Sequence, residues 1–158
     1  MSYQVKEIFY TLQGEGSNAG RPAVFCRFAG CNLWTGREQD RATAVCKFCD
    51  TDFSNGDVMT FEQIWAQITA VVHAHRVLTV KGPKLLVVIT GGEPLAQPSI
   101  TQFLIYLRER KVQTQIESAG IIERSLPFST TLVISPKMNE RTEQPLRITP
   151  AMLESADA

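Results

Sequence analysis

The 158-residue sequence has no excess of either charge, because 16 Lys and Arg residues balance 16 Asp and Glu residues. A protein that binds nucleic acid usually carries surplus positive charge, so no nucleic-acid partner is expected. Apolar runs extend to about five residues, whereas a membrane-spanning helix needs about 20. The first ten residues, MSYQVKEIFY, lack the basic segment and apolar stretch of a signal peptide. We therefore expect a cytoplasmic protein with no membrane partner.

Histidine and cysteine are scarce, with two and four copies respectively. His73 and His75 are two residues apart and point to different faces of a helix, so we expect them at the surface or in packing contacts. Without a secretory signal, the cysteines are expected to stay reduced and available for metal. The length and the 44% apolar content suit one domain, residues 1–158, with a single core.

Three of the cysteines, Cys31, Cys46 and Cys49, have a C-x14-C-x2-C spacing. Three thiolates can hold three irons of a 4Fe–4S cluster and leave the fourth iron without a protein ligand. An open metal position is typical of a site that performs chemistry. A structural zinc would need a fourth ligand, and neither histidine lies at finger spacing; a thioredoxin-like redox pair would leave Cys31 without a role. Both remain alternatives to the cluster, which is the favoured interpretation.

Alternating strand and helix patterns predict an α/β fold with right-handed βαβ units and a mostly parallel sheet. Strands are expected over residues 4–10, 22–28, 85–90, 112–117 and 131–135. Helices are expected over 60–76, 98–110 and 150–156, with a shorter one over 38–45, a turn over 53–57 and a helix break at 81–83. Thr60 and Gln63 form a capping box. Cys26 shares a strand face with Val24 and Phe28, so it is expected in the core.

Polar and glycine residues follow the expected strands at Cys31, Gly91, Glu117 and Ser135. The carboxyl ends of parallel strands meet at one edge of a sheet, where α/β folds place their sites, so we expect these residues to share a site. Arg27 lies in the otherwise apolar segment PAVFCRF, where a buried guanidinium needs an anion or a carboxylate as partner. The alternative is that Arg27 faces water at the strand end.

Three motifs together resemble a known family. They are the string TLQGEGSNAGRPAVFCRFAGCNLW over residues 11–34, the cysteine loop with Phe48 and Asp50-Thr51, and Gly91-Gly92-Glu93-Pro94. In these motifs the chain is similar to radical S-adenosylmethionine (SAM) enzymes and, through the long first cysteine gap, to the 7-carboxy-7-deazaguanine synthase family. The resemblance covers residues 5 to 140. It implies a partial (β/α) barrel of the radical SAM type, truncated at the C-terminus to about three quarters of the usual family length.

The resemblance implies that 6-carboxy-5,6,7,8-tetrahydropterin is converted to 7-carboxy-7-deazaguanine with loss of ammonia, a step towards queuosine. A reduced cluster would cleave the sulfonium of SAM and release a 5′-deoxyadenosyl radical, which survives only in a dry, closed pocket. Mg2+, an electron donor such as flavodoxin and a homodimer are expected with it. The alternatives are a radical SAM activase, which usually has a C-x3-C-x2-C loop, or a catalytically impaired binding module that holds a cluster or zinc.

The resemblance also assigns residues to each ligand. Cys31, Cys46 and Cys49 would hold the cluster, and Thr51 would give a hydroxyl to Mg2+. The SAM contacts would be Phe48, Asp50, Gly92, Ser135, Pro136 and Lys137. The pterin contacts would be Leu12, Gln13, Gly14, Arg27, Thr90 and Glu117, with Arg27 pairing the substrate carboxylate. Family members usually have Glu-Thr-Asn-Gly where this chain has ESAG at 117–120, so one polar contact is expected to be weaker.

Overall fold

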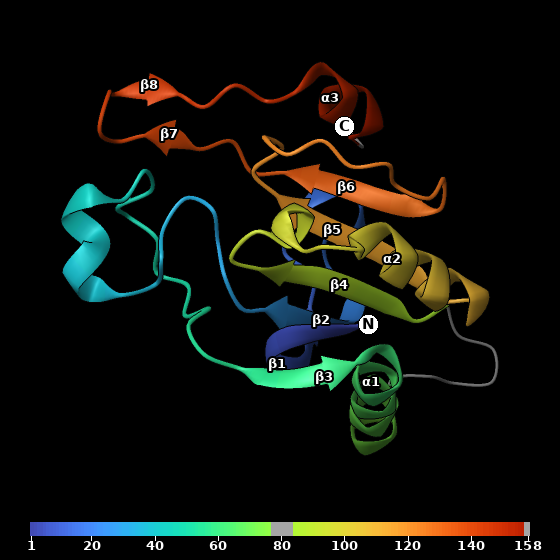
Figure 1. The fold of residues 1–158 in the computed structure, drawn as a ribbon. Coiled ribbons are helices and arrows are strands. Elements are labelled where there is room, and N and C mark those ends of the chain that lie inside the picture. The colour runs from blue at the N-terminus through green and yellow to red at the C-terminus, as the bar shows by residue number, and fades with distance from the viewer. Residues whose placement is uncertain (77–83, 157–158) are drawn as a thin grey trace.

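The central element is a six-stranded sheet in the order β3-β1-β2-β4-β5-β6 (Figure 1). It is seen in a computed structural model that describes residues 1–76 and 84–156. Its strands are β1 (Ser2–Leu12), β2 (Pro22–Phe28), β3 (Asp57–Thr60), β4 (Leu86–Gly91), β5 (Gln113–Ser118) and β6 (Thr130–Ile134). The pairs β2–β4, β4–β5 and β5–β6 are parallel. The predicted α/β fold with a mostly parallel sheet is confirmed.

Strand β1 runs antiparallel to both β2 and β3, and the predicted parallel pairing begins with β2 and β4. The chain reverses between β1 and β2 over residues 13–21. A parallel crossover needs a dozen or more residues and usually a helix, whereas an antiparallel pair can be joined by a short loop. Strand β3 was missed because its four residues are too few to show an alternating pattern.

Helices α1 (Phe61–His75) and α2 (Ile100–Glu109) pack against the sheet (Figure 1). The predicted capping box of α1 is confirmed. Thr60 Oγ1 accepts a hydrogen bond from the backbone N–H of Gln63 at 3.3 Å, and Gln63 Oε1 accepts one from the N–H of Thr60 at 2.8 Å. His75 is exposed and its ring stacks on Tyr10 at a centroid distance of 4.9 Å, as expected for a surface histidine. The helix break predicted at 81–83 lies outside the described residues.

Shorter elements complete the fold. They are the 3₁₀ helices η1 (Gly16–Asn18), η2 (Glu38–Thr43) and η3 (Pro94–Ala96), helix α3 (Pro150–Ser155), and a hairpin of β7 (Met138–Asn139) and β8 (Gln144–Pro145). Elements η2 and α3 were predicted. Elements η3, β7 and β8 were not, because two or three residues carry no readable periodicity. No helix in the ranges 1–76 and 84–156 is long and apolar enough to cross a membrane.

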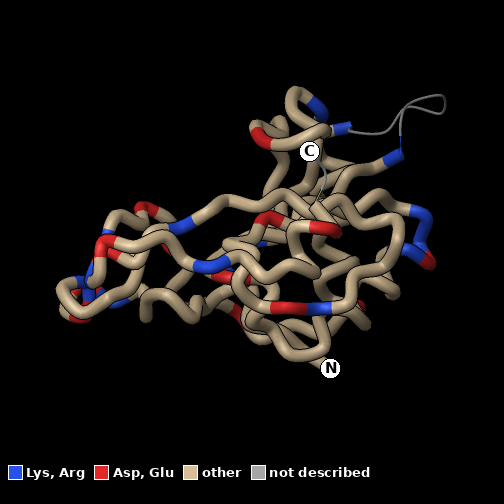
Figure 2. The backbone as a smooth tube through the Cα atoms, turned by 90° about the horizontal axis from the view of Figure 1, so that it is seen from above, with Lys and Arg blue, Asp and Glu red and all other residues tan. Residues whose placement is uncertain are grey.

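The core lies on both faces of the sheet. Val24, Cys26 and Phe28 are fully buried in the main cluster with the two long helices, as predicted for Cys26. Phe25 and Val88 belong to a smaller cluster on the opposite face. Burial on both faces is typical of parallel strands and holds their carboxyl ends in fixed positions. Basic and acidic residues are interspersed along the chain (Figure 2), in agreement with the balanced composition.

Candidate active site

A cleft of about 190 Å³ opens at the carboxyl ends of the parallel strands. The cysteine loop and the β7–β8 hairpin lie beyond the same end of the sheet (Figure 1). Residues after β2, β4, β5 and β6 all contribute to the wall, which confirms that the strand ends share one site. The residues with a predicted ligand role that line the cleft are Cys31, Cys46, Phe48, Cys49, Asp50, Thr51, Thr90, Gly92, Glu117, Ser135 and Lys137.

The three cysteines of the motif reach this cleft from two ends of one loop. The backbone N–H of Leu33 donates a weak hydrogen bond to Cys31 Sγ at 3.4 Å. Burial raises the pKa of Cys31 and also that of Cys46, where the neighbouring Cys49 adds to the effect. The thiols of Cys31 and Cys46 therefore keep their protons at neutral pH, and a metal must displace these protons when it binds.

The two candidate metal groups, zinc and a 4Fe–4S cluster, place different demands on their thiolate ligands. In the described part of the chain, no three His, Cys, Asp or Glu side chains are arranged to hold a single metal ion. A tetrahedral zinc with bonds of about 2.3 Å would need its thiolates about 3.8 Å apart. A 4Fe–4S cluster binds each thiolate through a different iron, so its ligands need not converge on one point. Three thiols around one cleft fit that donor set.

Two glycines at the end of β4, Gly91 and Gly92, allow backbone segments to approach closely at the cleft. A Cβ atom on Gly91 would overlap the backbone of Phe28. One on Gly92 would overlap the carbonyl of Gly30 and lie 2.7 Å from the Cβ of Cys31. Gly91 also has a φ of 135°, which L side chains rarely adopt. The turn after β4 is thereby held directly against the end of β2, next to the first cysteine.

Glu93 of the same turn has a role that the sequence did not reveal. Its side chain is 2% exposed. Oε1 accepts hydrogen bonds from the backbone N–H of Leu95 at 2.9 Å and from Ser118 Oγ at 2.8 Å, and Oε2 accepts one from the N–H of Ala119 at 2.9 Å. A buried carboxylate with three donors cross-links the ends of β4 and β5. The sequence contained one signal for this role. Glu93 directly precedes Pro94, the first residue of a helical turn, and this is the position of an N-terminal cap.

These contacts explain in part how Ser118 and Ala119 serve where family members usually have Thr and Asn. Ser118 supplies the hydroxyl that binds Glu93 and also accepts a hydrogen bond from the N–H of Gly120 at 3.0 Å. Ala119 takes part through its backbone, which does not depend on side-chain identity. The residues present in this chain therefore supply three hydrogen bonds at the turn after β5.

A polar ladder joins the loop of residues 13–21 to strand β5. It uses alternate residues of β5, which share one face of the strand. Gln13 Nε2 donates a hydrogen bond to Glu117 Oε1 at 2.9 Å. Asn18 Nδ2 donates one to Gln115 Oε1 at 2.9 Å, and Arg21 Nη1 donates one to Gln113 Oε1 at 2.8 Å. Because Gln13, Asn18 and Gln115 are at most 4% exposed, the first two bonds replace water that these groups have lost.

Arg27 lies in a second, polar hollow with Lys6, Glu7, Asp50 and Thr51 among its lining residues. Its Nε pairs with Glu7 Oε1 at 2.7 Å, so its partner is the carboxylate of the neighbouring strand. Asp50 and Thr51 line both hollows, which are therefore adjacent.

Not every predicted contact residue borders the main cleft. Its described lining, drawn from residues 1–76 and 84–156, does not include Leu12, Gln13, Gly14, Arg27 or Pro136. Gln13 reaches the cleft indirectly, through its bond to Glu117. Leu12 is 59% exposed to solvent at the end of β1.

No family model matches the chain. Three curated proteins called 7-carboxy-7-deazaguanine synthase are similar to it. The protein of Burkholderia multivorans is 56% identical over 110 residues (61% of this chain, 46% of the relative). That of Nitratidesulfovibrio vulgaris is 46% identical over 145 residues (89% and 66%), and that of Caulobacter vibrioides 50% identical over 129 residues (77% and 58%). The chain thus spans between about half and two thirds of the length of these relatives.

A solved structure is similar over almost the whole chain. The crystal structure of QueE from Escherichia coli superposes with a TM-score of 0.72 and 27% sequence identity. The match covers 99% of this chain and 69% of the QueE chain. The sheet and the strand ends that form the cleft are therefore part of a fold that this solved structure shares.

Proposed function

This chain belongs to the 7-carboxy-7-deazaguanine synthase family, and on that premise we propose that it is a radical SAM lyase acting on 6-carboxy-5,6,7,8-tetrahydropterin. The product would be 7-carboxy-7-deazaguanine, formed with loss of ammonia. The observation that carries the proposal is the cleft, which brings the three thiols of the C-x14-C-x2-C motif together with polar groups at the ends of β4, β5 and β6.

Cys31, Cys46 and Cys49 would hold a 4Fe–4S cluster, which, with SAM bound, supplies the radical chemistry. The bare backbone at Gly92 would admit the amino acid part of SAM, since no side chain obstructs it. Phe48 and Asp50, in the cysteine loop, and Ser135, Pro136 and Lys137, after β6, would provide further SAM contacts. Lys137 Nζ donates a hydrogen bond to Ser135 Oγ at 2.6 Å, so these two polar groups lie side by side.

Glu117 would accept hydrogen bonds from the amino and ring N–H groups of the pterin, with its Oε1 already oriented by Gln13. Thr90 borders the same cleft, while Leu12 and Gly14 flank Gln13 in the chain. Arg27 would exchange Glu7 for the substrate carboxylate, or share it, because a guanidinium has further donors beyond Nε. Thr51, which borders both hollows, would give its hydroxyl to a Mg2+ that retains several waters.

The proposal is tested by anaerobic reconstitution with iron and sulfide, followed by incubation with SAM, a reductant, Mg2+ and the carboxytetrahydropterin. Mass spectrometry should detect 7-carboxy-7-deazaguanine and 5′-deoxyadenosine. Cys31→Ala should abolish both products, and Cys26→Ala, which alters a core cysteine outside the cleft, should retain them. A protein that binds a cluster and never forms product would refute the proposed activity. A colourless protein with stoichiometric zinc would instead indicate a binding module.

The remaining family properties are proposed on the same premise. We expect a flavodoxin-like protein to act as electron donor, a homodimer in solution and a cytoplasmic location. Reduction of the reconstituted cluster by purified flavodoxin, light scattering of the purified protein, and cell fractionation respectively measure these three properties.

A further inference from the structure

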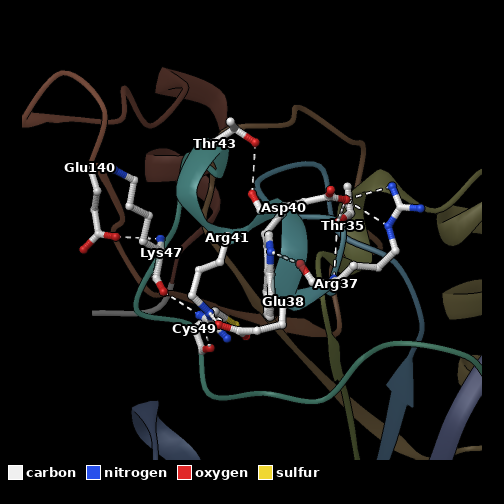
Figure 3. A network of polar contacts seen from close by, with 10 residues as sticks. Thr35, Arg37, Glu38, Asp40, Arg41, Thr43, Lys47, Cys49 and Glu140 are labelled. Atoms are coloured by element: carbon white, nitrogen blue, oxygen red, sulfur yellow. Dashed lines mark hydrogen bonds and ion pairs between the residues drawn. The ribbon is translucent and has the colours of Figure 1, made fainter.

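The short segment between Cys46 and Cys49 is held from two sides by polar groups (Figure 3). On one side stands Arg41 of η2. Its Nη1 donates hydrogen bonds to the carbonyl oxygens of Lys47 at 2.5 Å and Cys49 at 3.1 Å. A single guanidinium nitrogen therefore joins two carbonyls that flank the second cysteine of the pair.

Arg41 is itself fixed in place. Its Nε donates to both carboxylate oxygens of Glu38 at 2.8 Å. Its guanidinium carbon lies 4.1 Å from the ring centroid of Trp34, a cation–π contact. Since Trp34 is buried, this contact ties the position of Arg41 to the packed part of the loop.

The other side is supplied by Glu140, in the turn between β7 and β8. Its Oε2 accepts a hydrogen bond from the backbone N–H of Lys47 at 2.6 Å. Its own backbone N–H donates to the carbonyl oxygen of Val45 at 2.9 Å. Glu140 thus binds the chain on both sides of Cys46, from a position 93 residues away from Lys47.

Lys47 connects the two sides, because its N–H donates a hydrogen bond to Glu140 and its C=O accepts one from Arg41. With both flanking peptide groups bonded, the orientation of the Cys46–Cys49 turn is fixed. We propose that Arg41 and Glu140 are positioning residues that preorganise this turn for the cluster, an inference that rests on the proposed function for the identity of the metal group. Ligands held in place beforehand lose less conformational freedom when the metal binds.

The clamp formed by Arg41 and Glu140 is peripheral to the core. Element η2 has no buried residue, and among the residues that the structure describes the hairpin strands β7 and β8 pair only with each other. Substitutions in the clamp should therefore leave the six-stranded sheet folded while they loosen the Cys46–Cys49 turn. This separation makes a local role distinguishable from a general effect on stability.

The first experiment measures cluster loss. Reconstituted wild type, Arg41→Gln, Glu140→Ala and Glu140→Gln are mixed with an iron chelator under anaerobic conditions, and the absorbance of the cluster is followed. Arg41→Gln and Glu140→Ala should lose the cluster about tenfold faster, the order of effect seen when partners of metal ligands are removed. Glu140→Gln should behave nearly as wild type, because the amide oxygen can still accept the N–H of Lys47.

The matched control is Arg37→Gln, in the same loop. Arg37 pairs with Asp40 and does not bond the Cys46–Cys49 turn. It should lose the cluster at the wild-type rate. Equal rates for Arg41→Gln, Glu140→Ala and Arg37→Gln would overturn the proposal.

A second experiment uses the chain without metal and so does not depend on the proposed activity. Iodoacetamide alkylation of each cysteine is followed by mass spectrometry. Cys46 is 5% exposed, and its alkylation should accelerate several-fold in Glu140→Ala and return to the wild-type rate in Glu140→Gln. The fully buried Cys26 reports unfolding and should not change. Unchanged alkylation of Cys46 in Glu140→Ala would refute the clamp, whereas loss of product with an intact clamp would refute only the proposed reaction.

Discussion

Gln13 Nε2 donates a hydrogen bond to Glu117 Oε1 over 2.9 Å and joins two residues that are 104 positions apart. The amide of Gln13 is held at its other end as well, because its Oε1 accepts the backbone N–H groups of Gly14 at 2.6 Å and Glu15 at 3.0 Å. The glycine-rich loop after β1 thus sets the orientation of a carboxylate that lines the cleft at the end of β5.

Substitutions of Gln13 and Glu117 should each weaken substrate binding, and their effects should be coupled. Glu117→Gln should lower kcat/KM by about 10- to 100-fold, since a hydrogen bond to a charged group contributes about 1.5–3 kcal/mol. Gln13→Ala should have a smaller effect of the same kind. Steady-state kinetics of both variants and of the double variant form a thermodynamic cycle. Strictly additive effects would contradict the coupling that the hydrogen bond implies.

Asn18→Ala should destabilise the fold through the polar ladder. Gln115 is fully buried and would lose the donor that Asn18 Nδ2 provides at 2.9 Å. An unsatisfied buried group costs about 1–3 kcal/mol in the free energy of unfolding. Urea denaturation measures the change, with the exposed Gln102→Ala as control, expected within about 0.5 kcal/mol of wild type.

Gly92→Ala should disrupt the cleft, because the added Cβ would overlap the carbonyl of Gly30 and crowd Cys31. Overpacking of this kind costs about 1–3 kcal/mol, and here the strain falls on the backbone next to Cys31, a proposed cluster ligand. We expect a lower thermal midpoint and loss of SAM binding by calorimetry. Gly14→Ala, whose Cβ would meet nothing within 4 Å, should unfold at the wild-type temperature. Equal midpoints for the two variants would show that the close approach is not essential.

Cluster assembly should accelerate as the pH rises. Burial raises the pKa of Cys31 and Cys46 above that of an ordinary thiol, and only the thiolate binds iron. The fraction of thiolate at neutral pH is therefore small and increases towards pH 9. The rate at which the cluster absorbance appears, measured anaerobically between pH 7 and 9, should rise over this range, and a flat profile would contradict the prediction.

Stability should fall in acid partly through Asp52. Hydrogen bonds from Lys6 and Ser54 lower the pKa of Asp52 from 3.8 to about 2. Because the folded pKa is depressed, this contribution is present above pH 4 and is lost as the pH falls through 2. Urea unfolding at pH 2–5 should show a shallower pH dependence for Asp52→Asn than for wild type. The loop that carries Thr51 should loosen in the same variant.

Much of the site could be predicted from the sequence because its information is local. The spacing of Cys31, Cys46 and Cys49 and the capping box of Thr60 depend on residues close together in the chain. The burial of Cys26 follows from the alternation of a single strand. Each of these features depends on a short segment of the sequence and not on how distant segments pack together.

Other features were decided only by the tertiary structure. Whether β1 lies antiparallel to β2, whether Arg27 pairs with Glu7, and which donors surround Glu93 all depend on segments brought together by folding. The same holds for the polar ladder and for the contact of Glu140 with Lys47. The sequence by itself determined the thiols and the strand ends to which the chemistry is assigned in our proposal. Packing decided which buried polar groups face one another, because a hydrogen bond requires distances and angles that sequence spacing does not encode between distant segments.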